Sequence, residues 1–99
     1  MFDPRKLMDM MKQANDMQQK FQEELKTKVV TGSAGGGMVQ VTMNGQFEVL
    51  DMVIEDALFA AQDPGFAKDI LKAAMNDACQ KVRDMMAQES KSLLGKLGL

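Results

Sequence analysis

The residue types that usually carry catalysis are nearly absent from this 99-residue sequence. It contains no His and a single Cys, so it lacks the usual proton shuttle near neutral pH and cannot assemble a structural zinc site. Ser33, Ser90 and Ser92 have no His to activate them. No His or adjacent Lys stands beside Cys79, which we interpret as a small, semi-buried core residue. We therefore predict no enzymatic activity, no catalytic residue, no metal, no cofactor and no small-molecule substrate.

Two other patterns have the residue types of a ligand site but not the spacing. The glycine-rich segment 32–37 is followed by an apolar pair at 38–39, whereas a phosphate loop needs Lys and then Ser or Thr directly after its last glycine. We interpret this segment as a hairpin connection. The acids Glu55, Asp56 and Asp63 lack the alternating spacing of a calcium loop. We expect them to cap helices and shape turns.

Length and cysteine content limit the class of protein. One Cys cannot form an internal disulfide, which is typical of a reducing compartment. No apolar stretch approaches the roughly 18 residues of a membrane span, and the first residues lack the basic run and apolar core of a signal peptide. We therefore expect a single cytoplasmic domain over residues 1–99, because two domains would need about twice this length. Within it, residues 90–99 form a tail that we expect to fray beyond Leu94.

The net charge of −2 is unevenly distributed along the chain. Residues 1–28 carry six basic and five acidic residues, residues 29–66 carry five acids and no base, and residues 67–99 carry six bases and four acids. An anionic partner is therefore expected to meet the two ends and not the middle. The alternative is that both ends are solvated helices with mixed charges.

The first part of the chain has the pattern of a long amphipathic helix. Asp3 and Pro4 are typical of an N-cap and a first helical position, and neither Gly nor Pro interrupts residues 5–26. Apolar residues recur at spacings of three and four: Leu7, Met10, Met11, Ala14, Met17, Phe21 and Leu25. Such a helix is about 33 Å long, longer than the rest of a small domain can cover, so its apolar side needs another surface.

Methionine is abundant, with 11 residues in the chain. Met fills irregular gaps and suits adaptable interfaces. Four of these residues crowd the first helix, too many for one apolar face: Met8, Met10, Met11 and Met17. We interpret them as a dimer or partner interface built from the long helices, and a methionine-rich core is the alternative.

The middle of the chain predicts a three-stranded antiparallel meander. Three segments have β-branched or alternating patterns: 26–31, 38–43 and 46–55. The segment 32–37 breaks the first strand, and Asn44-Gly45 predicts a two-residue type I′ hairpin. In the third strand the alternation changes phase. Either a bulge near Val49-Leu50 restores one apolar face, or both faces are partly buried. Helices must cover one face of this sheet.

A second long helix is expected after the sheet. Residues 57–61 predict a short helical turn, and Asp63-Pro64 repeats the start signal of the first helix. The apolar side of the second helix consists mainly of small and medium residues: Ala67, Leu71, Ala74, Ala78, Val82 and Met85, flanked by Ile70 and Met75. Its alanines would permit close packing against the sheet. The predicted fold class is α+β, with a long N-terminal helix, the three-stranded meander and a long C-terminal helix.

The order of these segments resembles one protein family over roughly residues 4–90. The segments that carry the resemblance are the Met-rich helix from Met8 to Phe21, Val30-Thr31-Gly32-Ser33, Gly36-Gly37-Met38-Val39-Gln40-Val41-Thr42, Asn44-Gly45 and Ala73-Ala74-Met75-Asn76-Asp77-Ala78. This combination is similar to the YbaB/EbfC family of bacterial nucleoid-associated proteins. The resemblance implies a tweezer-like homodimer, binding of double-stranded DNA, a place in the nucleoid and a role in nucleoid organisation or gene regulation.

The residues that would contact DNA are not marked by any family motif, so we select them by charge. The basic residues of the two helices that we expect to contact phosphates are Arg5, Lys6, Lys12, Lys81, Arg83 and Lys91. The chain has no Trp or Tyr, which disfavours base stacking on single strands. The alternative function is a dimeric protein–protein adaptor that uses its Met-rich helices and has little direct affinity for DNA.

Overall fold

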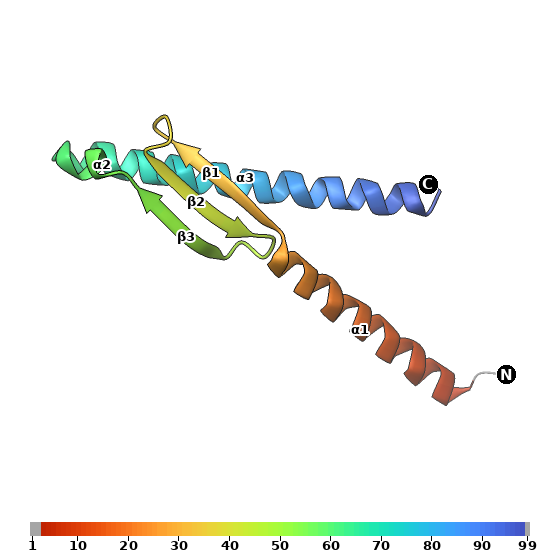
Figure 1. The fold of residues 1–99 in the computed structure, drawn as a ribbon. Coiled ribbons are helices and arrows are strands. Elements are labelled where there is room, and N and C mark those ends of the chain that lie inside the picture. The colour runs from red at the N-terminus through yellow and green to blue at the C-terminus, as the bar shows by residue number, and fades with distance from the viewer. Residues whose placement is uncertain (1–2, 99) are drawn as a thin grey trace.

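The computed structural model describes residues 3–98 and has the predicted α+β architecture (Figure 1). The elements in chain order are α1 (Pro4–Thr27), β1 (Val29–Ala34), β2 (Val39–Asn44), β3 (Val49–Ile54), α2 (Asp56–Ala60) and α3 (Pro64–Lys96). The protomer is elongated, measuring 72 × 26 × 18 Å. Across residues 3–98, none of the helices has the length and apolarity that spanning a bilayer would require.

Both long helices begin at the predicted cap residues. Asp3 Oδ1 accepts a hydrogen bond from the backbone N–H of Arg5 at 3.0 Å, and Asp63 Oδ1 accepts one from the backbone N–H of Phe66 at 3.1 Å. Each cap satisfies an N–H that the helix itself cannot pair. The helix α3 ends at Lys96, and fraying of the tail beyond Leu94 stays a prediction.

The sheet has the predicted order β1-β2-β3 with antiparallel neighbours, but the bounds of β1 differ from the prediction. The strand begins at Val29 instead of residue 26 and continues through Gly32 to Ala34. Gly32 does not break the strand. A Cβ there would lie 2.3 Å from the backbone N of Ala78, so the missing side chain permits close approach of α3. The turn falls later, at residues 35–38, where the backbone φ of the three glycines is positive.

The hairpin between β2 and β3 is longer than the predicted two-residue type I′ turn, and that prediction is wrong. The positive φ is at Phe47, 61°, and neither Asn44 nor Gly45 has one. The Asn44 side-chain oxygen instead accepts hydrogen bonds from the backbone N–H groups of Gln46 and Glu48, at 2.9 and 3.1 Å. Gly45 is needed for a different reason, since a Cβ there would lie 2.7 Å from the carbonyl oxygen of Leu25.

The predicted bulge in β3 is present. Thr42 pairs with Asp51 and Met43 pairs with Val49, so Leu50 is the extra residue of β3. The bulge brings the apolar residues of β3 onto the face that β2 directs toward the core. The residues on this face of β2 and β3 are Val39, Val41, Met43, Val49, Met52 and Ile54.

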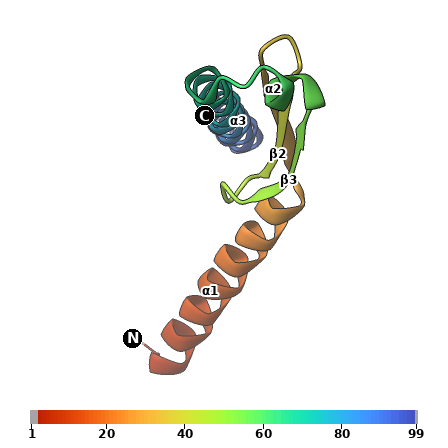
Figure 2. The same cartoon turned by 90° about the vertical axis from the view of Figure 1, so that its left-hand side faces the viewer.

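The core lies between α3 and this face of the sheet (Figure 2). Small side chains of α3 at Ala74 and Ala78 are fully buried, which lets the helix lie close to β1 and β2. Cys79 is semi-buried, as predicted, with its Sγ 4.0 Å from Met43 Sδ. The helix does not extend over β3, where Val49 and Met52 remain 45% and 37% exposed.

Adding one methyl group at two glycines of this fold should have opposite effects. Gly32→Ala should lower the free energy of unfolding by about 1–3 kcal/mol, because the new Cβ overlaps the backbone of α3. Gly95→Ala is the matched control in open space on the helix, and it should raise that free energy by up to about 1 kcal/mol. Urea unfolding at one protein concentration measures both. A neutral Gly32→Ala would contradict the close approach of β1 and α3.

Candidate nucleic-acid interface

The helices α1 and α3 diverge from the sheet like two arms, and the free end of each lies on the same side of the molecule (Figure 1). Few contacts hold α1 in place. Leu25 is its one buried residue, the Gly45 N–H donates to the Leu25 carbonyl at 2.9 Å, and the Gln46 side chain donates to the Gln22 carbonyl at 2.9 Å. The root of α1 is therefore fastened to the β2–β3 hairpin, and the rest of the helix projects away from the domain.

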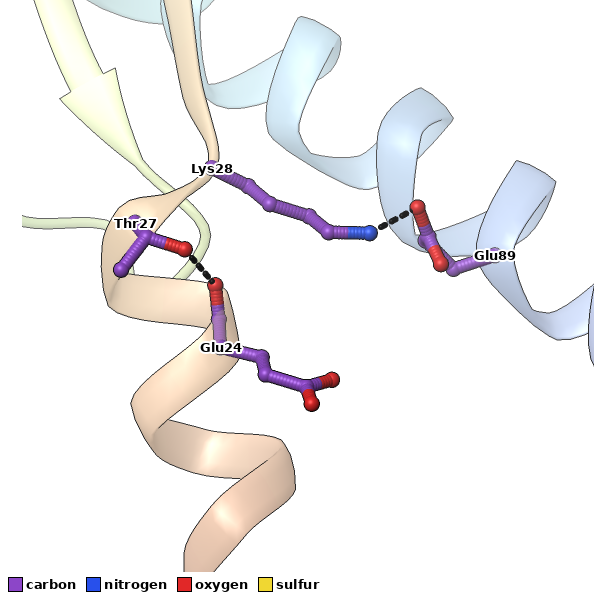
Figure 3. Close-up of polar contacts among 4 residues, drawn as sticks. All are labelled: Glu24, Thr27, Lys28 and Glu89. Carbon is purple, nitrogen blue, oxygen red and sulfur yellow. Dashed lines mark hydrogen bonds and ion pairs between the residues drawn. The ribbon is translucent and has the colours of Figure 1, made fainter.

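One ion pair connects the two arms where they diverge (Figure 3). Lys28, which follows α1, pairs with Glu89 of α3, and the Thr27 hydroxyl donates to the Glu24 carbonyl at 2.7 Å. The side chains of the pair are 36% and 42% exposed, so their contribution to stability is about 0–1 kcal/mol. The angle between the arms therefore depends mainly on the packing of Leu25.

The six basic residues selected from the sequence are all exposed, and they lie on both arms. Arg5, Lys6 and Lys12 belong to the outer half of α1, Lys91 to the free part of α3, and Lys81 and Arg83 to the part of α3 that packs on the sheet. The structure therefore does not bring all six residues together. It also does not bring the bases of α1 together with the bases of α3. Their contact with DNA remains a prediction.

The polar side of α1 has mixed charge. Successive residues of an α-helix are separated by about 100°, so residues on one side can be read from their spacing. Acids and bases share the side of α1 opposite its apolar residues: Arg5, Asp9, Lys12, Asp16, Lys20 and Glu23. Each base on this side of α1 therefore has a carboxylate nearby, which weakens the local positive potential.

The helix α3, in contrast, has a side with bases and no acids. Lys68, Lys72 and Arg83 lie within an arc of about 60° and extend over about 22 Å along the helix. We call these three residues the basic flank of α3. All three are exposed, and neither of the two ion pairs found within residues 3–98 involves them. Lys68 and Lys72 were not among the bases selected by charge. The four-residue spacing between them and the fifteen-residue spacing from Lys68 to Arg83 are nevertheless visible in the sequence.

Lys81 lies on the opposite side of α3 and contacts the outer edge of β1. Its Nζ is 3.1 Å from Asp77 Oδ2 and donates to the Thr31 carbonyl at 2.9 Å, while Asp77 accepts from the Ser33 N–H at 2.9 Å. The Ser33 hydrogen bond, with a smaller contribution from Lys81, holds the pKa of the Asp77 carboxyl below its ordinary value of 3.8. Lys81 therefore already has two partners, unlike the residues of the basic flank.

Both arms also expose apolar side chains. On α1, Met8, Met10, Met11 and Met17 are 64–73% exposed, as expected for a helix whose apolar side needs another surface. A cleft of about 230 Å³ lies between the arms near their root. Its lining residues are Phe21, Glu24, Glu89, Ser90, Ser92, Leu93 and Lys96.

A three-stranded antiparallel sheet backed by one long helix and extended by a second defines a two-armed α+β domain. The sequence profile of the YbaB/EbfC DNA-binding family matches residues 3–97, and the chain belongs to this family. The resemblance drawn from the sequence is thereby confirmed.

Relatives and a solved structure agree with this assignment over nearly the full length. A nucleoid-associated protein of Desulfotalea psychrophila is 45% identical and aligns with 91% of this chain and 88% of its own. A nucleoid-associated protein of Acidobacterium capsulatum is 36% identical, with 98% and 94% aligned. The crystal structure of an uncharacterized protein from Helicobacter pylori has a TM-score of 0.75 and 26% identity, covering 95% of this chain and 99% of the other.

The contact between Asp77 and β1 should make stability depend on pH. Because the pKa of this carboxyl is lowered in the folded state, the contact stabilises the fold above the ordinary carboxyl pKa and is lost as the pH falls through the folded value. The decrease in the free energy of unfolding between about pH 6 and pH 3 should be smaller in Asp77→Asn than in the wild type. Urea unfolding at both pH values measures it. Asp16→Asn on α1 is the control, and an unchanged pH dependence in Asp77→Asn would contradict the assignment.

Proposed function

We propose that this protein binds double-stranded DNA as a homodimer in the nucleoid and contributes to nucleoid organisation or gene regulation. Membership in the YbaB/EbfC DNA-binding family supports DNA as the partner, and bacterial relatives named as nucleoid-associated proteins support the location. The observation that carries the proposal is the basic flank of α3, which offers unpaired cations on a rigid helix to an anionic partner.

Surface area supports the homodimer. A compact monomer of this mass exposes about 5,600 Å², whereas the elongated protomer exposes 7672 Å². The excess is about 2,000 Å², well above the roughly 800 Å² that each partner contributes to a standard-size interface. The bare methionines of α1 and the bare face of β3 are part of this excess. A second copy is the partner that is available whenever the chain is made, and a closed two-fold dimer is the commonest arrangement.

The exposed cations fit a DNA-binding mode in which these side chains contact phosphates and do not read the base sequence. Lys and Arg reach phosphate oxygens on any sequence. We propose that the basic flank contacts DNA phosphates together with five further bases: Arg5, Lys6, Lys12, Lys81 and Lys91. Lys81 must leave Asp77 and Thr31 to reach a phosphate, so we expect it to contribute less than Arg83. The acidic residues of the hairpin and β3 belong to the sheet, whereas the basic flank belongs to α3.

A salt titration on duplex DNA tests this function. If the dimer neutralises about six phosphates, log K should fall with log salt at a slope near −5. Lys72→Ala and Arg83→Ala should each weaken binding uniformly across sequences and reduce the slope by about two, because each substitution removes one phosphate contact from both copies. Lys81→Ala should have a smaller effect, and Lys20→Ala, which removes a base outside the proposed contacts, is the matched control. Fluorescence anisotropy at two or more salt concentrations measures all four.

Two outcomes would contradict the proposal at different levels. Failure of micromolar wild-type protein to bind duplex at low salt would contradict DNA binding itself. A stable protein partner that co-purifies in equal amounts would then favour the adaptor function. Binding by the wild type with a larger loss in Lys20→Ala than in Lys72→Ala would contradict the basic flank as the site.

A further inference from the structure

One side of α1 carries amides and no acid. Successive residues of an α-helix are separated by about 100°, and an arc of about 100° on α1 holds four amide side chains that we call the amide side: Asn15, Gln18, Gln19 and Gln22. Lys26 lies in the same arc and Lys12 borders it, whereas none of the acids of α1 falls within it. The amide side therefore differs from the side of α1 on which acids and bases share the surface.

The amides of this side are available to a ligand. All four side chains are exposed. Other amides of the fold have partners, since the Gln46 side chain donates to the Gln22 carbonyl and the Gln80 side chain donates to Asp84. Among residues 3–98, no hydrogen bond is found to a side-chain amide of the amide side. Each of these amides thus offers a free carbonyl acceptor and a free NH₂ donor.

The amide side does little for the stability of α1 itself. Exposed helix positions are stabilised by residues of high helix propensity and by ion pairs at i, i+4 spacing. Asn has a low propensity because its side chain competes for backbone hydrogen bonds, and Asn15 lies in the middle of a 24-residue helix. Neutral amides form no ion pairs. The composition of this side therefore fits a role in binding better than a role in holding the helix together.

The free part of α1 has the size of a helix that enters the major groove of DNA. An α-helix with its side chains is about 10–12 Å across, and the major groove of B-DNA is about 12 Å wide. Figure 2 shows α1 leaving the sheet and α3, with no other element of the protomer beside its outer part. The hairpin reaches only the inner end of the amide side, where Gln46 contacts Gln22.

The apolar side of α1 does not compete with the amide side. The centres of the two sides are about 110° apart around the helix. A second copy that covered the exposed methionines Met10 and Met17 would therefore leave the amides open. Self-association and binding through the amide side are compatible on one helix.

Asn and Gln are the side chains that pair with adenine in the major groove, because their amide matches the N6 donor and the N7 acceptor of that base. From Asn15 to Gln22 the amide side extends about 10.5 Å along the helix, which corresponds to about three base-pair steps. We propose that the amide side of α1 reads adenine edges in the major groove of duplex DNA. This inference rests on the DNA binding of the proposed function and adds to it a site that distinguishes base sequences.

The two arms then have different roles on DNA. Phosphate contacts fix the position of a protein on the duplex, and base contacts carry the sequence information. The basic flank of α3 supplies phosphate contacts, and the amide side of α1 supplies base contacts. Lys12 and Lys26 lie before and after the amide side, about 21 Å apart along the helix, and neither belongs to the ion pairs found within residues 3–98. They would hold the phosphates beside the groove while the amides reach the bases.

Selection from a random duplex library tests the reading of sequence. The wild type should enrich duplexes in which adenine is over-represented within about three consecutive base pairs. A triple variant with Asn15→Ala, Gln18→Ala and Gln19→Ala should lose this enrichment. Its affinity for the unselected library should change by less than about twofold, because the phosphate contacts remain.

The control variant is Gln13→Ala, which removes an exposed amide from another side of α1 and should enrich the same sequences as the wild type. Alanine has a higher helix propensity than the residues it replaces, so each variant should keep α1. Far-UV circular dichroism checks that helix content is retained.

A modified base tests the groove. In an enriched duplex, 7-deazaadenine removes the N7 acceptor from the major groove, and 3-deazaadenine removes the N3 acceptor from the minor groove. Fluorescence anisotropy should show that the 7-deaza duplex binds the wild type at least about tenfold more weakly than the unmodified duplex. For the triple variant the two duplexes should differ by less than about twofold. The 3-deaza duplex should bind the wild type as the unmodified duplex does.

The outcomes separate base reading from the proposed function. A wild type that does not bind duplex DNA at low salt would overturn the proposed function and this inference together. A wild type that binds duplex DNA without enriching any sequence would overturn the inference alone. Loss of enrichment in Gln13→Ala as large as in the triple variant, or equal binding of the 7-deaza and unmodified duplexes by the wild type, would overturn it as well.

Discussion

The backbone of β1 approaches α3 at Gly32 more closely than any side chain would permit. A Cβ there would lie within 2.3–2.7 Å of three atoms of Ala78, and Ala74 and Ala78 on the helix are small enough to complete the contact. This close approach centres α3 over β1 and β2 and buries the core there. A helix held so near these two strands does not reach the third. The exposed face of β3 is therefore a consequence of the glycine in β1, at the other edge of the sheet.

The same contact determines where polar and apolar surface can lie. With α3 seated on the sheet, one of its sides reaches the edge of β1 and supplies Asp77 and Lys81, while the other side directs the basic flank into solvent. The acids of the middle segment are confined to the hairpin, β3 and the caps of α2 and α3. The exposed bases of α3 and the exposed apolar residues of β3 thus belong to different elements of one small domain.

Local signals were sufficient for much of the fold. The caps at Asp3 and Asp63 and the bulge at Leu50 each follow from chemistry within a few residues, and the structure confirms them. The wrong predictions concern positions whose conformation is determined by a contact with a residue far away in the sequence. Gly32 is a turn residue by local preference, and only its contact with Ala78, 46 positions later, makes it a strand residue. Gly45 is likewise required by its close contact with Leu25 and not by the φ angles of a tight turn. The basic flank was missed because the bases were selected by charge alone, without the helical angle that places Lys72 and Arg83 on one side. That angle distinguishes a basic side of α3 from its acidic side only once the buried side of the helix is known.

The single buried residue of α1 also has a mechanical meaning. The helix is about 36 Å long and is fastened only near Leu25 and the hairpin, so it acts as a lever with its pivot at one end. A rotation of about 10° at that pivot moves the tip at Pro4 by about 6 Å, close to the pitch of one helical turn. Small changes of φ and ψ at Thr27 and Lys28 would therefore move the tip of α1 by several ångströms, as in the 10° example, without altering the core between α3 and the sheet.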